Sequence, residues 1–181
     1  GFNGLINIIE IFDWILTDRL GVKKFKEYGY ENVSYFPVFS FDSSFRLLNI
    51  ERIYDITFVG SFNHQIQKKR SYWLERIARL GDKYCIKFST GIYGEEYVKL
   101  LNQSKIVFNH SIRSEMNMRC FEVTACGALL FYEEDNLEIR DFFENGKECV
   151  LYNRENLEDL FEYYLSHDQE RENIAYAGWK R

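Results

Sequence analysis

From residue 55 onward, short apolar runs alternate with longer segments of helical periodicity, and this alternation limits the folds open to the chain. The run Asp55–Val59 is rich in β-branched and aromatic residues, which is typical of a buried strand. The next segment, Lys68–Leu80, is amphipathic and stops before Gly81, which suits a helix C-cap. Strands that alternate with such helices indicate βαβ units. We therefore predict an α/β domain over residues 55–181, with a Rossmann-like open parallel sheet and helices on both faces.

The rest of this domain continues the same alternation. Further strands are predicted at Tyr84–Phe88, Lys105–Asn109, Ala128–Tyr132 and Glu148–Tyr152, and further helices at Glu95–Asn102, Asn117–Cys126, Leu137–Phe143, Leu157–Ser166 and Gln169–Arg181. Helical crossovers bring each strand back in the same direction, so the strands would be parallel. In an open sheet of this kind, ligands bind beyond the carboxyl ends of the strands.

The first part of the chain has a shorter version of the pattern. Residues 13–17 predict a strand, Arg19–Tyr28 a helix and Val33–Val38 a second extended run. Residues 39–54 lack periodicity and are predicted to be a linker. We therefore expect the end of a second α/β domain over residues 1–38, ahead of the linker and the main domain.

The charge and the cysteine content argue against several classes of binding partner. The net charge of −5 argues against a general nucleic-acid or membrane-surface binder. The four cysteines form no CxxC or Cys/His pattern, which predicts no metal site and a reducing, cytoplasmic location. No apolar run is long enough to span a bilayer, and no signal peptide is visible; the start at Gly1 rather than Met favours a fragment or a processed chain. The acidic stretch Glu133–Asp135 is interpreted as a solvated loop.

Small or hydrogen-bonding residues follow three of the predicted strands. They are Gly60-Ser61, Ser89-Thr90-Gly91 and Asn109-His110-Ser111. A phosphate-bearing ligand needs such residues, because bulky side chains would block its approach to the backbone. The alternative is that these residues only make tight turns.

The strongest local signal lies at the start of the predicted helix Asn117–Cys126. A helix N-terminus offers free N–H groups and the positive end of a dipole, which suits a diphosphate. Arg119 lies in the first turn, where a cation opposes the dipole unless it faces an anionic ligand. Glu122 lies three residues further along, on the same face, and its carboxylate could accept hydrogen bonds from two ribose hydroxyls. The alternative is a surface ion pair between these two side chains.

Several motifs resemble one family. Glu122-Val-Thr-Ala-Cys-Gly127 looks like the E-x-x-A-x-G end of the donor-site motif of GT-B glycosyltransferases, and N-x-R-x-F-E over Asn117–Glu122 resembles the group that includes the spore maturation protein CgeB. Tyr54–Ser61 followed by Arg70 is similar to the opening of that family's C-terminal domain, and Ser104–Asn109 to the strand before the motif.

The resemblance implies a transferase that moves a sugar from a nucleotide-sugar donor, with a UDP-sugar favoured, to an unidentified acceptor, without a bound metal. It implies that Glu122 holds the ribose, that Asn117 and Met118 present amides to the diphosphate, and that Arg119 and Arg70 are phosphate partners. Gly60 and Ser61 would line the floor of the cleft, with Asn109 close by. The acceptor would bind the N-terminal domain, which would also supply the base.

One position departs from the family's pattern. Retaining members often carry a second glutamate eight residues before the ribose glutamate, where this chain has Ser114 beside Glu115. For a base within this chain, His110 and His64 are the nearest candidates, and His110 follows a strand end. A non-catalytic nucleotide-binding or assembly module derived from a transferase is the alternative function. A flavodoxin-like or response-regulator domain is a third.

Overall fold

The computed structural model describes residues 11–37, 42–63 and 68–181. The chain divides into two compact units, residues 1–38 and 39–181. In the first unit, β1 (Ile15–Thr17) and β2 (Val33–Tyr35) pair in parallel and α2 (Arg19–Glu27) connects them. The side chain of Asp18 caps this helix by accepting a hydrogen bond from the amide of Gly21 at 2.7 Å. The predicted βαβ unit is therefore present.

The second unit contains a five-stranded sheet in which all neighbours are parallel, in the order β4-β3-β5-β6-β7. The strands are β3 (Tyr54–Val59), β4 (Ile86–Ser89), β5 (Ser104–Phe108), β6 (Leu129–Glu133) and β7 (Val150–Tyr152). In the register of the sheet, Ile56 of β3 lies between Ile86 of β4 and Ile106 of β5. Because β5 and β6 are buried on both faces, they carry continuous apolar runs rather than alternating ones.

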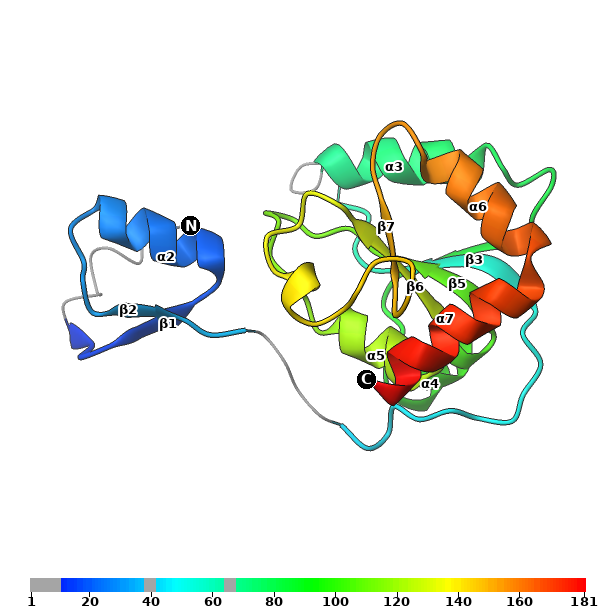
Figure 1. Cartoon of the computed structure of the whole chain (residues 1–181), viewed down its shortest axis with the longest axis horizontal. Helices are drawn as coiled ribbons and strands as arrows, with labels where there is room; N and C mark the ends of the chain where they lie inside the picture. The colour runs from blue at the N-terminus through cyan, green and yellow to red at the C-terminus, as the bar shows by residue number, and fades with distance from the viewer. Residues whose placement is uncertain (1–10, 38–41, 64–67) are drawn as a thin grey trace. The chain divides into compact units, whose positions relative to one another are not determined.

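Helices cover both faces of this sheet. They are α3 (Lys68–Ala78), α4 (Gly94–Asn102), α5 (Arg119–Ala125), α6 (Leu157–Ser166) and α7 (Asp168–Lys180). Figure 1 shows α3 and α6 on one face, with α4 and α5 on the other. Each face has its own apolar core, one built on α4 and α5 and the other on α3, α6 and α7. The predicted Rossmann-like α/β fold is confirmed.

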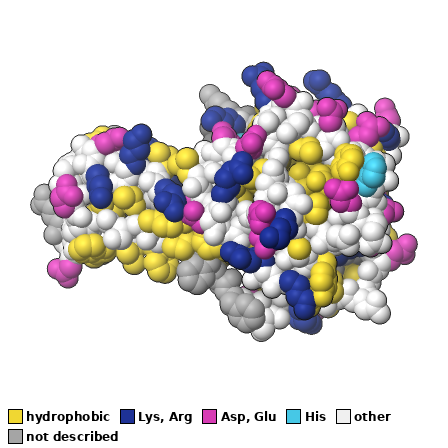
Figure 2. Space-filling model, viewed as in Figure 1, with side chains coloured by type: hydrophobic (Ala, Val, Ile, Leu, Met, Phe, Trp, Pro, Cys, Tyr) yellow, Lys and Arg dark blue, Asp and Glu magenta, His cyan; other side chains and the backbone are white. Residues whose placement is uncertain are grey.

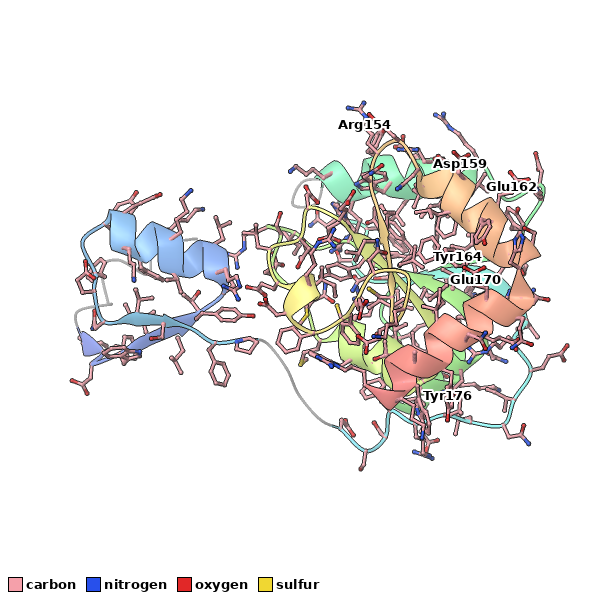
Figure 3. The ribbon with its side chains drawn as sticks, in the orientation of Figure 1. Arg154, Asp159, Glu162, Tyr164, Glu170 and Tyr176 are labelled. Atoms are coloured by element: carbon pink, nitrogen blue, oxygen red, sulfur yellow. The ribbon has the colours of Figure 1, made fainter. Side chains whose placement is uncertain are left out.

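The amphipathic character of α6 explains how it packs. Tyr164 is buried against the sheet, whereas Asp159 and Glu162 are exposed. Figure 3 shows these two acidic side chains on the outer side of the helix. Acidic and basic side chains intermingle on the face of the second unit drawn in Figure 2, with no broad patch of one sign there. None of the helices in the described part of the chain has the length and apolar character that crossing a bilayer requires.

Three predicted helices differ from the structure by two residues or more at an end, and one of them is α3, which ends at Ala78 rather than Leu80. The helix expected over Leu137–Phe143 is only a 3₁₀ turn, η2 (Ile139–Asp141), because the side chain of Asn136 binds the amides of Glu138 and Ile139 and fixes a tight turn. The helix expected from Asn117 begins at Arg119. Side-chain hydrogen bonds hold the residues before it in a loop, as described below.

The segment predicted as a linker forms no helix or strand within residues 42–53, yet it packs on the second unit. Leu48 donates its amide to the side chain of Asn102 at 2.7 Å. Arg52 donates to the carbonyls of Asn102 at the end of α4, Ser104 at the start of β5 and Gly127 just beyond α5. A single guanidinium thus satisfies two carbonyls that helix ends leave open and one at a strand start.

We predict that Arg52→Met destabilises the second unit by about 2–4 kcal/mol, because three partly buried carbonyls lose their donor. Urea unfolding monitored by circular dichroism measures this loss. Arg46→Met is the matched control, since Arg46 is exposed and, among the described residues, its guanidinium bonds the nearby Ser44 carbonyl alone. Equal stabilities of the two variants would contradict the prediction.

Candidate functional site

The site lies at the edge of the sheet where β3, β5 and β6 end. These strands are neighbours and parallel, so Gly60-Ser61, Asn109–Ser111 and Glu133 lie at the same edge. The amide of Gly60 bonds the carbonyl of Ser89 at 2.9 Å, which joins the end of β4 to this edge. The three strand ends that the sequence singled out therefore lie together.

Phe58, near the end of β3, carries two guanidinium groups against its ring. The guanidinium carbon of Arg70 lies 5.4 Å from the ring centre, and that of Arg119 lies 5.7 Å from it. Such cation–π contacts favour a cation beside an aromatic face. A Cβ atom at Gly60 would lie 2.8 Å from the Phe58 ring and 3.5 Å from the Arg119 guanidinium. The glycine therefore leaves the space in which these groups meet.

Backbone carbonyls of two loops of the site hold the guanidinium of Arg70. It is 6% exposed and donates to the carbonyl of His110 at 2.8 Å and to that of Ser61 at 3.4 Å. Burial and, next, the positive charge of Arg119 lower the pKa of Arg70. Arg70 stays charged, since its ordinary pKa is far above neutral. Two cations therefore face one small region of the protein.

Arg119, at the start of α5, is oriented by asparagines. It donates to the side-chain oxygen of Asn109 at 2.9 Å, and Asn109 donates in turn to the side chain of Asn117 at 2.8 Å. Its Nε atom is buried and has no hydrogen-bond partner among the described residues. Nor does Arg119 form an ion pair within that part of the chain. An uncompensated guanidinium is the expected partner of an anionic ligand.

The loop before α5 presents its amides at the same place. Met118 is the N-cap residue of α5. The amides of Cys120 and Phe121 donate hydrogen bonds to the carbonyls of Asn117 and Met118, respectively. The amide of Asn117 faces the side chains of Cys120 and Tyr132, whereas the amides of Met118 and Arg119 donate to no described group. Together with the Arg119 side chain, these two amides leave donors available at this strand edge.

Glu122 lies one turn further into α5 and is partly exposed. Its Oε2 atom accepts a hydrogen bond of 2.7 Å from the hydroxyl of Tyr97 on α4. The alternative reading, an ion pair with Arg119, is not found among the described residues; the partner of Glu122 is a tyrosine that the sequence analysis did not select. Tyr97 falls on the apolar face of its helix, a position that in sequence signals only core packing.

His110 lies beneath the site rather than in it. It is 8% exposed, its Nδ1 atom is 3.0 Å from the hydroxyl of Tyr152, and its ring packs against Trp73. Burial, followed by the charges of Arg70 and Lys69, lowers the pKa of His110 to about 4. The ring is therefore neutral at pH 7, and its role as a base stays a prediction. The other candidate, His64, lies outside the described residues.

Glu133 was interpreted as part of a solvated stretch, but it is 3% exposed. It ends β6 and accepts the amide of Ser111 at 2.9 Å, while its other oxygen is buried without a hydrogen-bond partner among the described residues. Burial raises the pKa of Glu133 to about 7. Only Glu134 and Asp135 of that stretch are exposed. In the sequence, nothing distinguishes a buried acidic residue at a strand end from a solvent-exposed one.

The position eight residues before Glu122 has an unusual backbone. Ser114 has a φ of 63°, in the left-handed region that non-glycine residues seldom occupy. The carboxylate of the adjacent Glu115 turns back to the amide of Arg113 at 2.6 Å. Glu115 therefore caps its own loop.

Solved structures of low sequence identity share this fold. Anabaena HepE, in complex with UDP-glucose, matches 93% of this chain at 13% identity with a TM-score of 0.61. The pneumococcal O-GlcNAc transferase GtfA, in complex with UDP and GlcNAc, matches 99% at 11% identity with a TM-score of 0.63. The C-terminal domain of LpcC, a group 1 family glycosyl transferase from Francisella tularensis, matches 76% at 11% identity with a TM-score of 0.58. The fold is thus that of a GT-B glycosyltransferase domain.

Residues 46–181 match the sequence model of the glycosyl transferase-like family, so the chain belongs to this family. No curated protein matches its sequence significantly. The chain spans 58% of the HepE chain and 43% of the GtfA chain, whereas it spans 93% of the LpcC domain. The family match therefore lies within the second unit.

We predict that Glu133→Gln stabilises the protein increasingly as the pH rises. The fold raises the pKa of this carboxyl from 4.5 to about 7, so the stability present below pH 4.5 is lost as the pH rises through 7. The glutamine variant does not undergo this loss, which amounts to about 3 kcal/mol at most by pH 8. Urea unfolding at pH 5, 6 and 8 measures the difference from the native protein.

The control for this series is Glu134→Gln, which removes an exposed acid from the same segment. A stability difference between Glu133→Gln and the native protein that is constant from pH 5 to pH 8 would show that Glu133 does not titrate in this range.

Proposed function

We propose that this chain is the donor-binding part of a glycosyltransferase that transfers a sugar from a nucleotide sugar to an acceptor. Family membership and the GT-B fold support the class of reaction. The observation that carries the donor site is Arg119, whose half-buried guanidinium lies beside Arg70 with no acidic partner in the described chain. Two cations gathered in this way suit a diphosphate.

The arginines and amides would act on the leaving group. As the bond between sugar and phosphate breaks, negative charge builds on the departing nucleoside diphosphate. Arg119, Arg70 and the amides of Asn117 and Met118 are fixed before this happens, so they stabilise that charge without reorganising. Gly60 and Ser61 would form the floor below the phosphates. Asn109 would act through Arg119, because its side chain is fully buried.

Glu122 would bind the ribose. A carboxylate has about four lone-pair positions, and in Glu122 one of them is taken by Tyr97. The remaining positions are sufficient for two neighbouring hydroxyls. UDP is the favoured nucleotide, since HepE and GtfA are both found with UDP or UDP-glucose. The motif Asn117–Glu122 further favours the CgeB-like branch of the family.

We predict that UDP at millimolar concentration raises the melting temperature of the chain. A ligand at about 100 times its dissociation constant adds roughly 2.7 kcal/mol of stability. Arg119→Ala should weaken UDP binding about tenfold or more but change uridine binding little, because the lost contact is to phosphate. Arg79→Ala, at an exposed position, is the control. No shift with UDP, GDP, ADP or dTDP would argue against the proposed function.

We also predict that Glu122 distinguishes ribose from deoxyribose. Glu122→Ala should weaken UDP binding by about 1–3 kcal/mol, and Glu122→Gln should retain part of the affinity through its one carbonyl oxygen. Removing the 2′-hydroxyl should weaken binding to the native protein much more than to the alanine variant, and this non-additivity isolates the contact. Isothermal titration with UDP and 2′-deoxy-UDP measures it. An unchanged deoxy penalty in Glu122→Ala would remove the ribose assignment.

A further inference from the structure

The hydrogen bond between Tyr97 and Glu122 links two helices at the candidate site. The tyrosine hydroxyl lies 2.7 Å from Oε2 of the glutamate, and it comes from α4 rather than from the donor-site helix. The tyrosine is 9% exposed, whereas the glutamate is partly open to solvent. A buried tyrosine hydroxyl needs a partner, and here the partner is a functional carboxylate rather than a backbone carbonyl.

The ring of Tyr97 is itself held in place. Phe45 packs edge-on against it, with ring centres 5.7 Å apart and an angle of 81° between the planes. Burial raises the pKa of Tyr97, the charge of Arg119 opposes this rise, and the charge of Glu122 adds to it. The hydroxyl therefore keeps its proton and acts as the donor in this bond.

Helix α5 has only seven residues, and within the described chain the Glu122 carboxylate is held by this one side-chain hydrogen bond. A glutamate on so short a helix has three rotatable bonds and little to restrict them. Losing that freedom on binding would reduce the affinity for a ligand that the carboxylate must grip with both oxygens.

We propose that Tyr97 is a positioning residue: it fixes the Glu122 carboxylate in the orientation that binds the ribose diol of the donor. The proposal rests on the donor site proposed above. The hydroxyl occupies one lone pair of Oε2, which sets the plane of the carboxylate and leaves its other lone pairs directed toward the ligand. Tyr97 itself makes no contact with the nucleotide.

A purely structural role would have a different signature. If the bond only ties α4 to α5, its loss lowers stability and weakens UDP and 2′-deoxy-UDP equally. If it positions the carboxylate, its loss mainly reduces the advantage of UDP over 2′-deoxy-UDP. The chain supplies a matched pair away from the site: Tyr163 donates to Glu170 at 2.7 Å, between α6 and α7. Figure 3 labels Glu170 on α7.

The experiment measures the affinities of UDP and 2′-deoxy-UDP by isothermal titration for the native chain, Tyr97→Phe, Glu122→Ala, the double variant and Tyr163→Phe. Tyr97→Phe should weaken UDP about 3- to 10-fold and bring the ratio of the two affinities at least about threefold closer to one. The double variant should match Glu122→Ala, because Tyr97 acts through Glu122. Tyr163→Phe should leave both affinities unchanged.

Three results would overturn the proposal. An unchanged ratio in Tyr97→Phe, with Glu122→Ala still lowering it, defeats this inference alone. A further loss of affinity in the double variant shows that Tyr97 acts independently of Glu122. Absence of UDP binding by the native chain removes the proposed function and the inference with it. If Tyr97→Phe does not fold, Phe45→Leu keeps the hydroxyl but frees its ring, and the ratio should shift in the same direction.

Discussion

The parallel pairing of β3, β5 and β6 is the constraint on which the rest of the site depends. Parallel strands end at one edge, so residues far apart in sequence, such as Gly60, Asn109 and Glu133, meet there. Neither arginine could be held as it is without this edge, because Phe58 supports both guanidiniums and the carbonyls of two loops fix Arg70. The chemistry of the site is thus a consequence of strand order.

Buried acids hold the loop that leads into α5. Glu133 accepts the amide of Ser111, and Glu138 accepts that of Met116 at 2.9 Å. Both carboxyls are almost fully buried, which costs free energy that the hydrogen bonds only partly offset in the case of Glu133. The loop between them is kept out of the helix, and amides within it donate to the Glu115 carboxylate and to the Ser111 hydroxyl.

The segment 42–53 has a comparable supporting role on the opposite side of α5. Arg52 satisfies carbonyls at the ends of two helices, and Phe45 packs on Tyr97, which in turn contacts Glu122. This irregular segment therefore contacts the candidate ribose-binding carboxylate indirectly, because Phe45 packs on Tyr97 and Tyr97 bonds Glu122. Residues outside the sheet and helices therefore support part of the proposed donor site.

The sequence by itself determined the order of elements and the parallel sheet, because apolar periodicity and glycine stops are local properties of the chain. It also selected Arg119 and Glu122 through their spacing on one turn. Only the tertiary structure decided that Glu133 is buried and that Tyr97, on an apolar helix face, donates to Glu122. Likewise, the start of α5 at Arg119 depends on side chains distant in sequence. The physical reason is that burial and side-chain pairing are set by neighbours across the fold, which periodicity along the chain does not encode.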